Sequence, residues 1–144
     1  MIEFESFSIE FTLKEQESVR DWLLFLIKKY GEEASRITYV FMSDEELLKI
    51  NQEYLQHDYY TDIITFPFHD SGSPIESDIY ISVDRVRDNA NNYDVDFEDE
   101  LHRVMVHGVL HLLGFDDHSE EDRKEMRKAE ANALSFREWK SPRG

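Results

Sequence analysis

The sequence contains no cysteine, no long apolar run and few basic residues. Without cysteine, the chain can form neither disulfides nor thiolate–zinc clusters, which fits a reducing compartment, and we expect a cytoplasmic protein. The longest apolar run, residues 22–27, is far shorter than the roughly 20 residues that cross a membrane. The first residues alternate apolar and acidic side chains, so they do not resemble a signal peptide.

The 32 acidic residues outnumber the 16 basic ones, which gives a net charge of −16. Such a surface repels polyanions at long range, so a general electrostatic attraction to nucleic acid is not expected. If the substrate is RNA, its phosphates must meet a local basic patch, a metal ion or a partner protein. The simpler interpretation is that the acidity keeps the protein soluble.

Hydrophobic periodicity predicts four strands and about five helices. The strands are expected at residues 2–11 with a break near Ser6, 36–42, 62–66 and 78–83, and the last two form a hairpin. The helices are expected at 14–30, 44–55, 84–93, 97–113 and 120–136, with N-caps at Ser43, Asp96 and Ser119. At 144 residues, we expect one α/β (α+β) domain over residues 1–140 with a mixed four-stranded sheet, and a disordered tail at 141–144.

Three of the six histidines stand close together near the end of the helix expected at 97–113. His107 and His111 are four residues apart, so they share one helix face and can chelate one metal ion. Gly114 can end the helix and turn the chain back, which brings Asp117 or His118 toward the same ion. The pattern predicts a three-ligand site with an open position for water. Zn²⁺ is the leading candidate, although nickel, cobalt or iron also bind such ligands.

The residue after His107 is Gly108, where metallopeptidases with an H-E-x-x-H motif have their glutamate general base. This difference argues against peptide hydrolysis by that mechanism. A glycine inside a helix costs about 1 kcal/mol relative to alanine. Two explanations stay open: close approach of a strand or of substrate at the metal face, or helix–sheet packing alone.

Three segments share a recognisable pattern. Residues 107–116 read H-G-V-L-H-L-L-G-F-D, residues 51–68 read N-Q-E-Y-L-Q-H-D-Y-Y-T-D-I-I-T-F-P-F, and residues 78–82 read D-I-Y-I-S. In order and spacing they resemble the YbeY family of bacterial endoribonucleases, the rRNA maturation factors. The corresponding family patterns are H-G-x-L-H-L-x-G-Y-D-H, N-x-x-Y-R-x-x-D-x-P-T-D-V-L-S-F-P and G-D-I-x-I-S.

The resemblance implies a single-strand-specific, metal-dependent endoribonuclease that acts in rRNA 3′ end maturation and ribosome quality control. It also implies an α/β fold with the metal in a cleft between the motif helix and the sheet. Small-subunit ribosomal proteins and an assembly GTPase are the partners it implies, and such a partner would suit an acidic chain.

Two departures from the family pattern affect the site. The family's third histidine falls on Asp117, an acceptable zinc ligand, and His118 stands one residue later as the alternative. Leu55 stands where the family has an arginine thought to contact the RNA phosphate. Arg103 lies four residues before His107 on the same helix face and could replace that contact, although a solvated arginine is the simpler interpretation.

Other polar and aromatic residues are candidates for the site. The resemblance places Asp62 at the edge of the cleft, where it would orient a water molecule, fix a histidine tautomer or cap a turn. Glu130 is either a partner behind the metal ligands or a partly exposed acid. His57 and His69 are expected to be solvated in loops. Three aromatic residues either stack on RNA bases or belong to the core: Tyr54, Tyr59 and Phe66.

Three functions follow from these patterns. The leading one is a zinc-dependent endoribonuclease that activates a water or a 2′-hydroxyl. The second is a ribosome-assembly binding factor whose metal is structural, which Leu55 and the net charge favour. The third is a small-molecule or peptide metallohydrolase, against which the missing glutamate after His107 counts.

Overall fold

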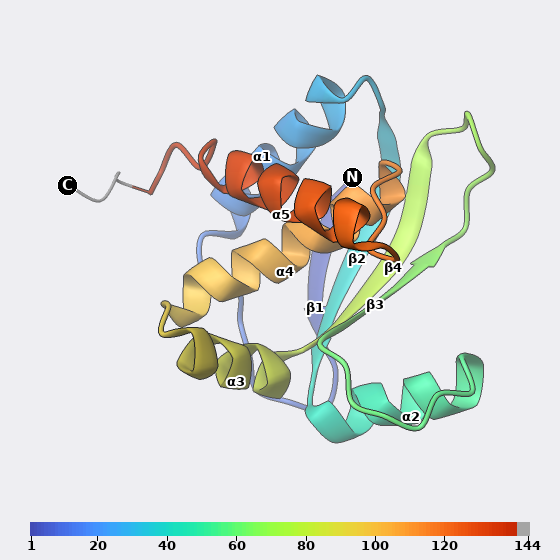
Figure 1. Cartoon of the computed structure of the whole chain (residues 1–144), viewed down its shortest axis with the longest axis vertical. Helices are drawn as coiled ribbons and strands as arrows, with labels where there is room; N and C mark the ends of the chain where they lie inside the picture. The colour runs from blue at the N-terminus through green and yellow to red at the C-terminus, as the bar shows by residue number, and fades with distance from the viewer. Residues whose placement is uncertain (141–144) are drawn as a thin grey trace.

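The computed structural model describes residues 1–140, which form four strands and five helices in one domain (Figure 1). The expected tail at 141–144 lies outside the described residues. In chain order the elements are β1 (Ile2–Ser6), α1 (Gln16–Lys29), β2 (Ala34–Met42), α2 (Asp44–Tyr54), β3 (Ile63–Pro67), β4 (Ile75–Ser82), α3 (Val83–Tyr93), α4 (Phe97–Leu112) and α5 (Glu120–Leu134). Within residues 1–140 no helix has the length and apolar character needed to span a membrane.

The four strands form one mixed sheet in the order β1-β2-β4-β3, which confirms the predicted fold class. β2 pairs in parallel with both β1 and β4, whereas β3 and β4 pair antiparallel as the predicted hairpin. The parallel register sets Tyr39 opposite Ile79, and the hairpin sets Ile63 opposite Ile81. β3, which leads into the site, is therefore an edge strand.

The first predicted strand was too long, because β1 ends at Ser6 instead of continuing to Phe11. Ser8 has a φ of 60°, which turns the backbone out of the extended conformation. Phe11 instead packs its ring 5.0 Å from that of Phe41, so its apolar character reflects packing on the core and not strand pairing.

The predicted N-cap residues stand at the starts of their helices, but they do not all make a capping hydrogen bond. Ser43 accepts a hydrogen bond from the backbone N–H of Glu46, and Ser119 forms a complete capping box with Asp122. Asp96 occupies the N-cap of α4, yet its side chain makes no capping bond among the described residues.

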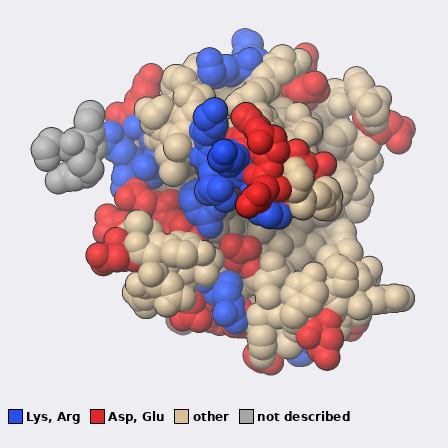
Figure 2. Space-filling view, in the orientation of Figure 1, with Lys and Arg blue, Asp and Glu red and all other residues tan. Residues whose placement is uncertain are grey.

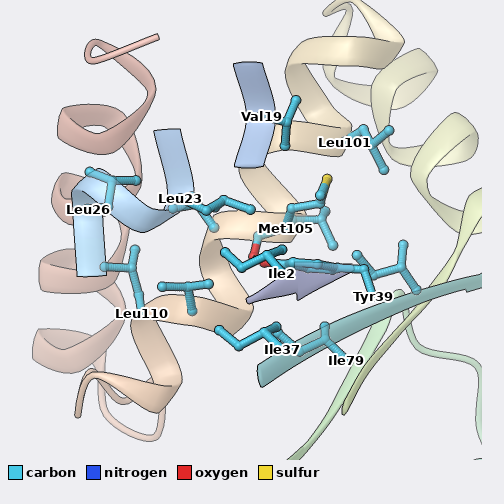
Figure 3. Packing of buried hydrophobic residues seen from close by; sticks show 14 of the residues in the cluster. Ile2, Val19, Leu23, Leu26, Ile37, Tyr39, Ile79, Leu101, Met105 and Leu110 are labelled. Atoms are coloured by element: carbon cyan, nitrogen blue, oxygen red, sulfur yellow. The ribbon is translucent and has the colours of Figure 1, made fainter. Parts of the chain in front are cut away.

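The main core lies between the sheet and the layer of α1 and α4 (Figure 3). Tyr39 is fully buried and its hydroxyl donates to the Met105 carbonyl at 2.8 Å, which ties α4 to the central strand β2. Burial of each large apolar side chain stabilises the fold by roughly 1.5–3 kcal/mol. A smaller cluster on the opposite face of the sheet holds α2 and comprises Met42, Leu47 and Ile64.

Gly108 lies where α4 comes closest to the sheet. A Cβ atom at this position would stand 3.0 Å from Cδ1 of Ile63 and 3.2 Å from Cδ1 of Ile79. The side chains of β3 and β4 therefore fill the space beside the glycine. Of the two explanations open at the sequence level, close helix–sheet packing is the one that the structure supports.

His102 on α4 is buried between the rings of Trp22 and Trp139, at centroid distances of 5.7 and 5.8 Å. Arg137 donates from Nη1 to the His102 Nδ1 at 2.8 Å. Burial, reinforced by the positive charge of Arg137, lowers the pKa of His102 to about 3. The imidazole is therefore neutral in the folded protein.

This burial predicts a pH dependence of folding. The pKa of His102 is near 6.5 in the unfolded chain and about 3 in the folded one. The stability that the neutral, buried His102 contributes is thus fully present above pH 6.5 and is lost as the pH falls toward 3. Between pH 6 and 4, the free energy of unfolding should fall by about 1.4 kcal/mol more per pH unit in the wild type than in His102→Gln. Urea unfolding at several pH values measures this free energy for both proteins. Parallel plots of the free energy of unfolding against pH would contradict the prediction.

Candidate metal centre

The end of α4 is built to reverse the chain. Gly114 has a φ of +105°, and its N–H donates to the His111 carbonyl at 3.0 Å. The N–H of Phe115 donates to the Leu110 carbonyl at 2.9 Å, so the two bonds form a Schellman motif. A residue with a Cβ atom is strained at this φ, and the glycine allows the turn that returns Asp117 toward the helix.

Three side chains converge after this turn. The Asp117 Oδ2 lies 3.7 Å from Nε2 of His107 and 3.6 Å from Nε2 of His111. The three ligand atoms lie within 4.8 Å of one another, and the two rings are 4.7 Å apart between centroids. Ligands of a tetrahedral zinc ion with bonds of about 2.0–2.1 Å stand roughly 3.3–3.5 Å apart. Two imidazoles and one carboxylate at this spacing could hold a metal ion.

His118, the alternative third ligand, points elsewhere. Its side chain is 82% exposed, and its Nε2 lies 3.1 Å from Oδ1 of Asp116. Asp116, Asp117 and His118 also form a close group, but all three are exposed and two of them are acidic. The structure therefore brings Asp117, and not His118, to the histidine pair.

A buried carboxylate fixes the orientation of His107. The Glu130 Oε2 lies 2.6 Å from Nδ1 of His107, and the Glu130 side chain is only 5% exposed. With Nδ1–H donating to Glu130, the lone pair of Nε2 faces Asp117 and is available to a metal ion. Of the two interpretations of Glu130 that its sequence position left open, the structure supports a partner behind the histidine pair.

Arg103 completes a chain of charges behind His107. It donates from Nη1 to Glu130 at 3.1 Å, and from Nε and Nη2 to Glu100 at 2.9 and 2.6 Å. These two carboxylates are buried, and their hydrogen bonds and charges raise the pKa of Arg103. Its guanidinium thus already holds two carboxylates, which is a different environment from the solvated or phosphate-contacting arginine expected from the sequence.

Two hollows meet at the candidate metal site. The first, here named the α2–β3 groove, measures about 500 Å³ and includes Leu55, His57, Tyr59 and Asp62. The second, here named the α3–α5 cleft, measures about 550 Å³ and includes Tyr93, Val95, Glu100, Arg103, Arg123, Met126, Arg127 and Glu130. His107 and Asp117 line both, and His111 lines the groove, so two of the three converging side chains stand where the two hollows join.

Asp62 faces the α2–β3 groove just before β3. Asn89 donates to its Oδ2 at 3.3 Å. Burial raises the pKa of the Asp62 carboxyl, while the charges of Arg103 and His107 oppose the rise. Because Glu130 already bonds to His107, the tautomer is held by Glu130. Orienting a water molecule and capping the turn before β3 stay predictions for Asp62.

The whole chain matches a known family. The family model described as Endoribonuclease YbeY matches residues 1–137. This chain belongs to the YbeY family. The relative from Bacteroides thetaiotaomicron, named Endoribonuclease YbeY, is 43% identical over 125 residues, which cover 87% of this chain and 90% of the relative. The relative from Porphyromonas gingivalis, also named Endoribonuclease YbeY, is 48% identical over 116 residues, which cover 81% of this chain and 76% of the relative.

A solved structure supports the same assignment. The solution structure of TM1509 from Thermotoga maritima aligns with a TM-score of 0.69 at 26% identity, and it covers 96% of this chain and 91% of that one. The predicted YbeY resemblance is therefore confirmed over nearly the full length, well beyond the three motifs that suggested it.

Leu55 and His57 mark how this YbeY chain differs at the groove. Leu55 is 39% exposed and lines the α2–β3 groove, so an arginine at this position would reach it. His57, two residues later, is exposed as expected but also lines the groove. The Tyr59 hydroxyl lies 2.9 Å from its Nδ1, and the two rings stack at 5.0 Å. The sequence did not reveal this placement of His57, although its proximity to Leu55 was a signal.

The remaining candidates divide between the groove and the packing. Tyr59 lines the groove, whereas Tyr54 and Phe66 pack edge to face at 6.2 Å on the α2 side of the sheet. The Nδ1 of His69 accepts from the backbone N–H of Glu76 at 3.1 Å, which holds the loop between β3 and β4.

The Glu130–His107 bond predicts a loss of metal affinity in Glu130→Gln. Removal of such an outer partner typically weakens metal binding by about 10- to 100-fold. Chelator competition with Zn²⁺ measures the dissociation constant. Glu125→Gln, an exposed acid on the same helix, is the matched control and should leave it unchanged. Equal affinities for the wild type and Glu130→Gln would contradict the assignment.

Proposed function

We propose that this chain is a zinc-dependent endoribonuclease that cleaves single-stranded precursor rRNA during 3′ end maturation and ribosome quality control in the cytoplasm. Membership of the YbeY family supports the reaction. The observation that carries the proposal for this chain is the convergence of His107, His111 and Asp117 at the junction of two open hollows. An extended strand can pass such a junction and bring one phosphate to it.

Zn²⁺ is the proposed ion, held by His107, His111 and Asp117. Neutral imidazoles and a carboxylate are ligands that zinc accepts, and three protein ligands leave a position for the reaction. When bound there, zinc would polarise a phosphoryl oxygen and make a nearby water more acidic. The buried Glu130 keeps His107 in the tautomer that this binding requires.

The groove residues supply the other roles. We propose that Asp62, whose pKa is raised by burial, orients the attacking water or 2′-hydroxyl and accepts its proton. Asn89 holds this carboxylate in place. His57, oriented by Tyr59, contacts the phosphate and takes the part of the arginine that Leu55 replaces. Arg103, with its two carboxylate partners, positions Glu130 and does not contact RNA in this proposal.

A binding factor with a structural metal is the second candidate, and Leu55 is the observation that favours it. Small-subunit ribosomal proteins and an assembly GTPase are the partners we propose under either function, because basic ribosomal proteins suit a chain of net charge −16. The metallohydrolase is not favoured, since the family is one of endoribonucleases and Gly108 faces β3 and β4.

The nuclease proposal predicts that cleavage depends on the metal site. A labelled single-stranded RNA should be cut by the purified protein, and a chelator should abolish cleavage that added Zn²⁺ restores. His107→Ala should lower the rate by at least about 100-fold, because it removes one of three ligands. His118→Ala is the matched control and should stay within about twofold. Gel electrophoresis of the cleavage products from single-stranded and duplex RNA measures these rates. Cleavage that continues in the presence of the chelator would contradict the mechanism.

The role of His57 predicts a rescue. Loss of one charge-assisted contact to the reacting phosphate should lower kcat in His57→Ala by about 10- to 100-fold without changing bound zinc. Adding Leu55→Arg to His57→Ala should restore most of the lost kcat, because the arginine's guanidinium enters the same groove. Single-turnover cleavage and metal analysis measure both effects.

The same variants separate the two candidate functions. A wild type that cuts RNA and a double variant that regains activity support the nuclease with His57 in the arginine's role. Cleavage that appears only in Leu55→Arg, with an inactive wild type, would instead identify a binding factor.

A further inference from the structure

Helix α5 carries a cluster of cations on an otherwise acidic molecule. Arg123, Lys124, Arg127 and Lys128 are all exposed, and within residues 1–140 none of them has a carboxylate oxygen within 4.0 Å. Figure 2 shows Lys and Arg gathered over α5, beside a strip of Asp and Glu. Arg123 donates to two backbone carbonyls, but no carboxylate of the described residues neutralises any of the four charges, so they are available to a ligand.

The four cations divide between two faces of the helix. Arg123 and Arg127 are four residues apart, share one face and line the α3–α5 cleft. Lys124 and Lys128 line a separate depression on α5 together with Glu121 and Glu125, and Arg127 borders it as well. Because the cleft also includes His107 and Asp117, the arginine face leads directly to the candidate metal centre.

The opposite wall of the cleft is aromatic. Tyr93, the last residue of α3, is 62% exposed and lines the cleft together with Val95. An exposed tyrosine ring is a platform on which an unpaired base can stack. A cleft with two arginines on one wall and a tyrosine on the other matches the phosphate and base of a single strand.

The acidic groups of the cleft do not cancel these arginines. Glu100 and Glu130 are buried and bonded to Arg103, and Glu130 also bonds to His107. Asp117 stands with the metal-site histidines. Each carboxylate thus has a partner within the site, which leaves the guanidinium groups of α5 as the charges that face a ligand.

We propose that the α3–α5 cleft binds the segment of single-stranded RNA next to the phosphate that is cut. Arg127 and Arg123 bind phosphates of this segment, and Tyr93 stacks on one of its bases. Arg123 also donates to the carbonyls of Asp117 and His118, at 3.4 and 3.3 Å, so the strand would lie against the loop that carries the third ligand. The assignment deepens the proposed function and rests on it for the identity of the substrate.

Binding without cleavage tests the cleft separately from the nuclease activity. The probe is a labelled 2′-O-methyl uridine dodecamer, which lacks the 2′-hydroxyl, and its integrity is checked on a gel. Fluorescence anisotropy gives the Kd between about 50 and 200 mM salt. The variants are Arg127→Gln and its matched control Lys128→Gln, which removes the same charge from the other face of the same helix, and Tyr93→Ala with Tyr93→Phe as its control.

Each variant has its own expected signature. Arg127→Gln should weaken binding by about 5- to 10-fold and lower the slope of log Kd against log salt by about 0.7, the value for one phosphate contact on a single strand. Lys128→Gln should change the Kd less than about twofold. Tyr93→Ala should weaken binding by about 5- to 10-fold with the salt slope unchanged, and Tyr93→Phe should bind like the wild type.

Three results would overturn the assignment. Equal losses in Arg127→Gln and Lys128→Gln would show that only the total charge matters. Unchanged binding in both Arg127→Gln and Tyr93→Ala would place the strand elsewhere. If Arg127→Gln lost binding to a polyglutamate peptide while its binding to RNA stayed intact, the cleft would instead be a docking site for an acidic protein. A wild type that binds RNA through the cleft but never cuts it would count against the nuclease and leave the cleft assignment standing.

Discussion

The close contact between α4 and the sheet at Gly108 fixes the geometry on which the site depends. At this position the helix lies against Ile63 of β3 and Ile79 of β4, with no room for a Cβ atom unless these side chains shift. The Tyr39–Met105 hydrogen bond fixes the position of the helix over β2. Because β3 and α4 both line the α2–β3 groove, this packing sets where the histidine pair lies in the groove.

A chain of hydrogen-bonded side chains then decides what each polar residue can do. His107, Glu130, Arg103 and Glu100 are bonded in that order, from the groove to the interior. Two buried carboxylates need a cation, and Arg103 supplies it. The arginine nearest the metal centre in sequence is thereby committed to orientation, so the positive charges offered to a substrate must come from other elements. The exposed arginines of α5 are in position to provide them, and His57 lines the α2–β3 groove as a further hydrogen-bonding group.

The distribution of charge also reconciles a net charge of −16 with an RNA substrate. The long-range field of the whole chain is repulsive, but interactions with a phosphate are governed by charges within about one Debye length, roughly 8–10 Å. Within residues 1–140, the carboxylates that line the α3–α5 cleft lie beside Arg103 or the histidine pair, whereas the cations of α5 have no carboxylate partner. A partner of opposite charge can reduce the long-range repulsion, while the local arrangement selects where the strand lies.

The sequence by itself determined the secondary structure, the mixed sheet, the family and the pairing of His107 with His111, because these follow from periodicity and motifs within short segments. It gave too long a first strand, since alternation cannot reveal the left-handed Ser8. Only the tertiary structure placed Asp117, and not His118, beside the histidine pair, buried Glu130 behind His107, and opened the α3–α5 cleft. Each of these depends on where a turn or a distant helix comes to lie, and that is set by packing between segments far apart in the chain.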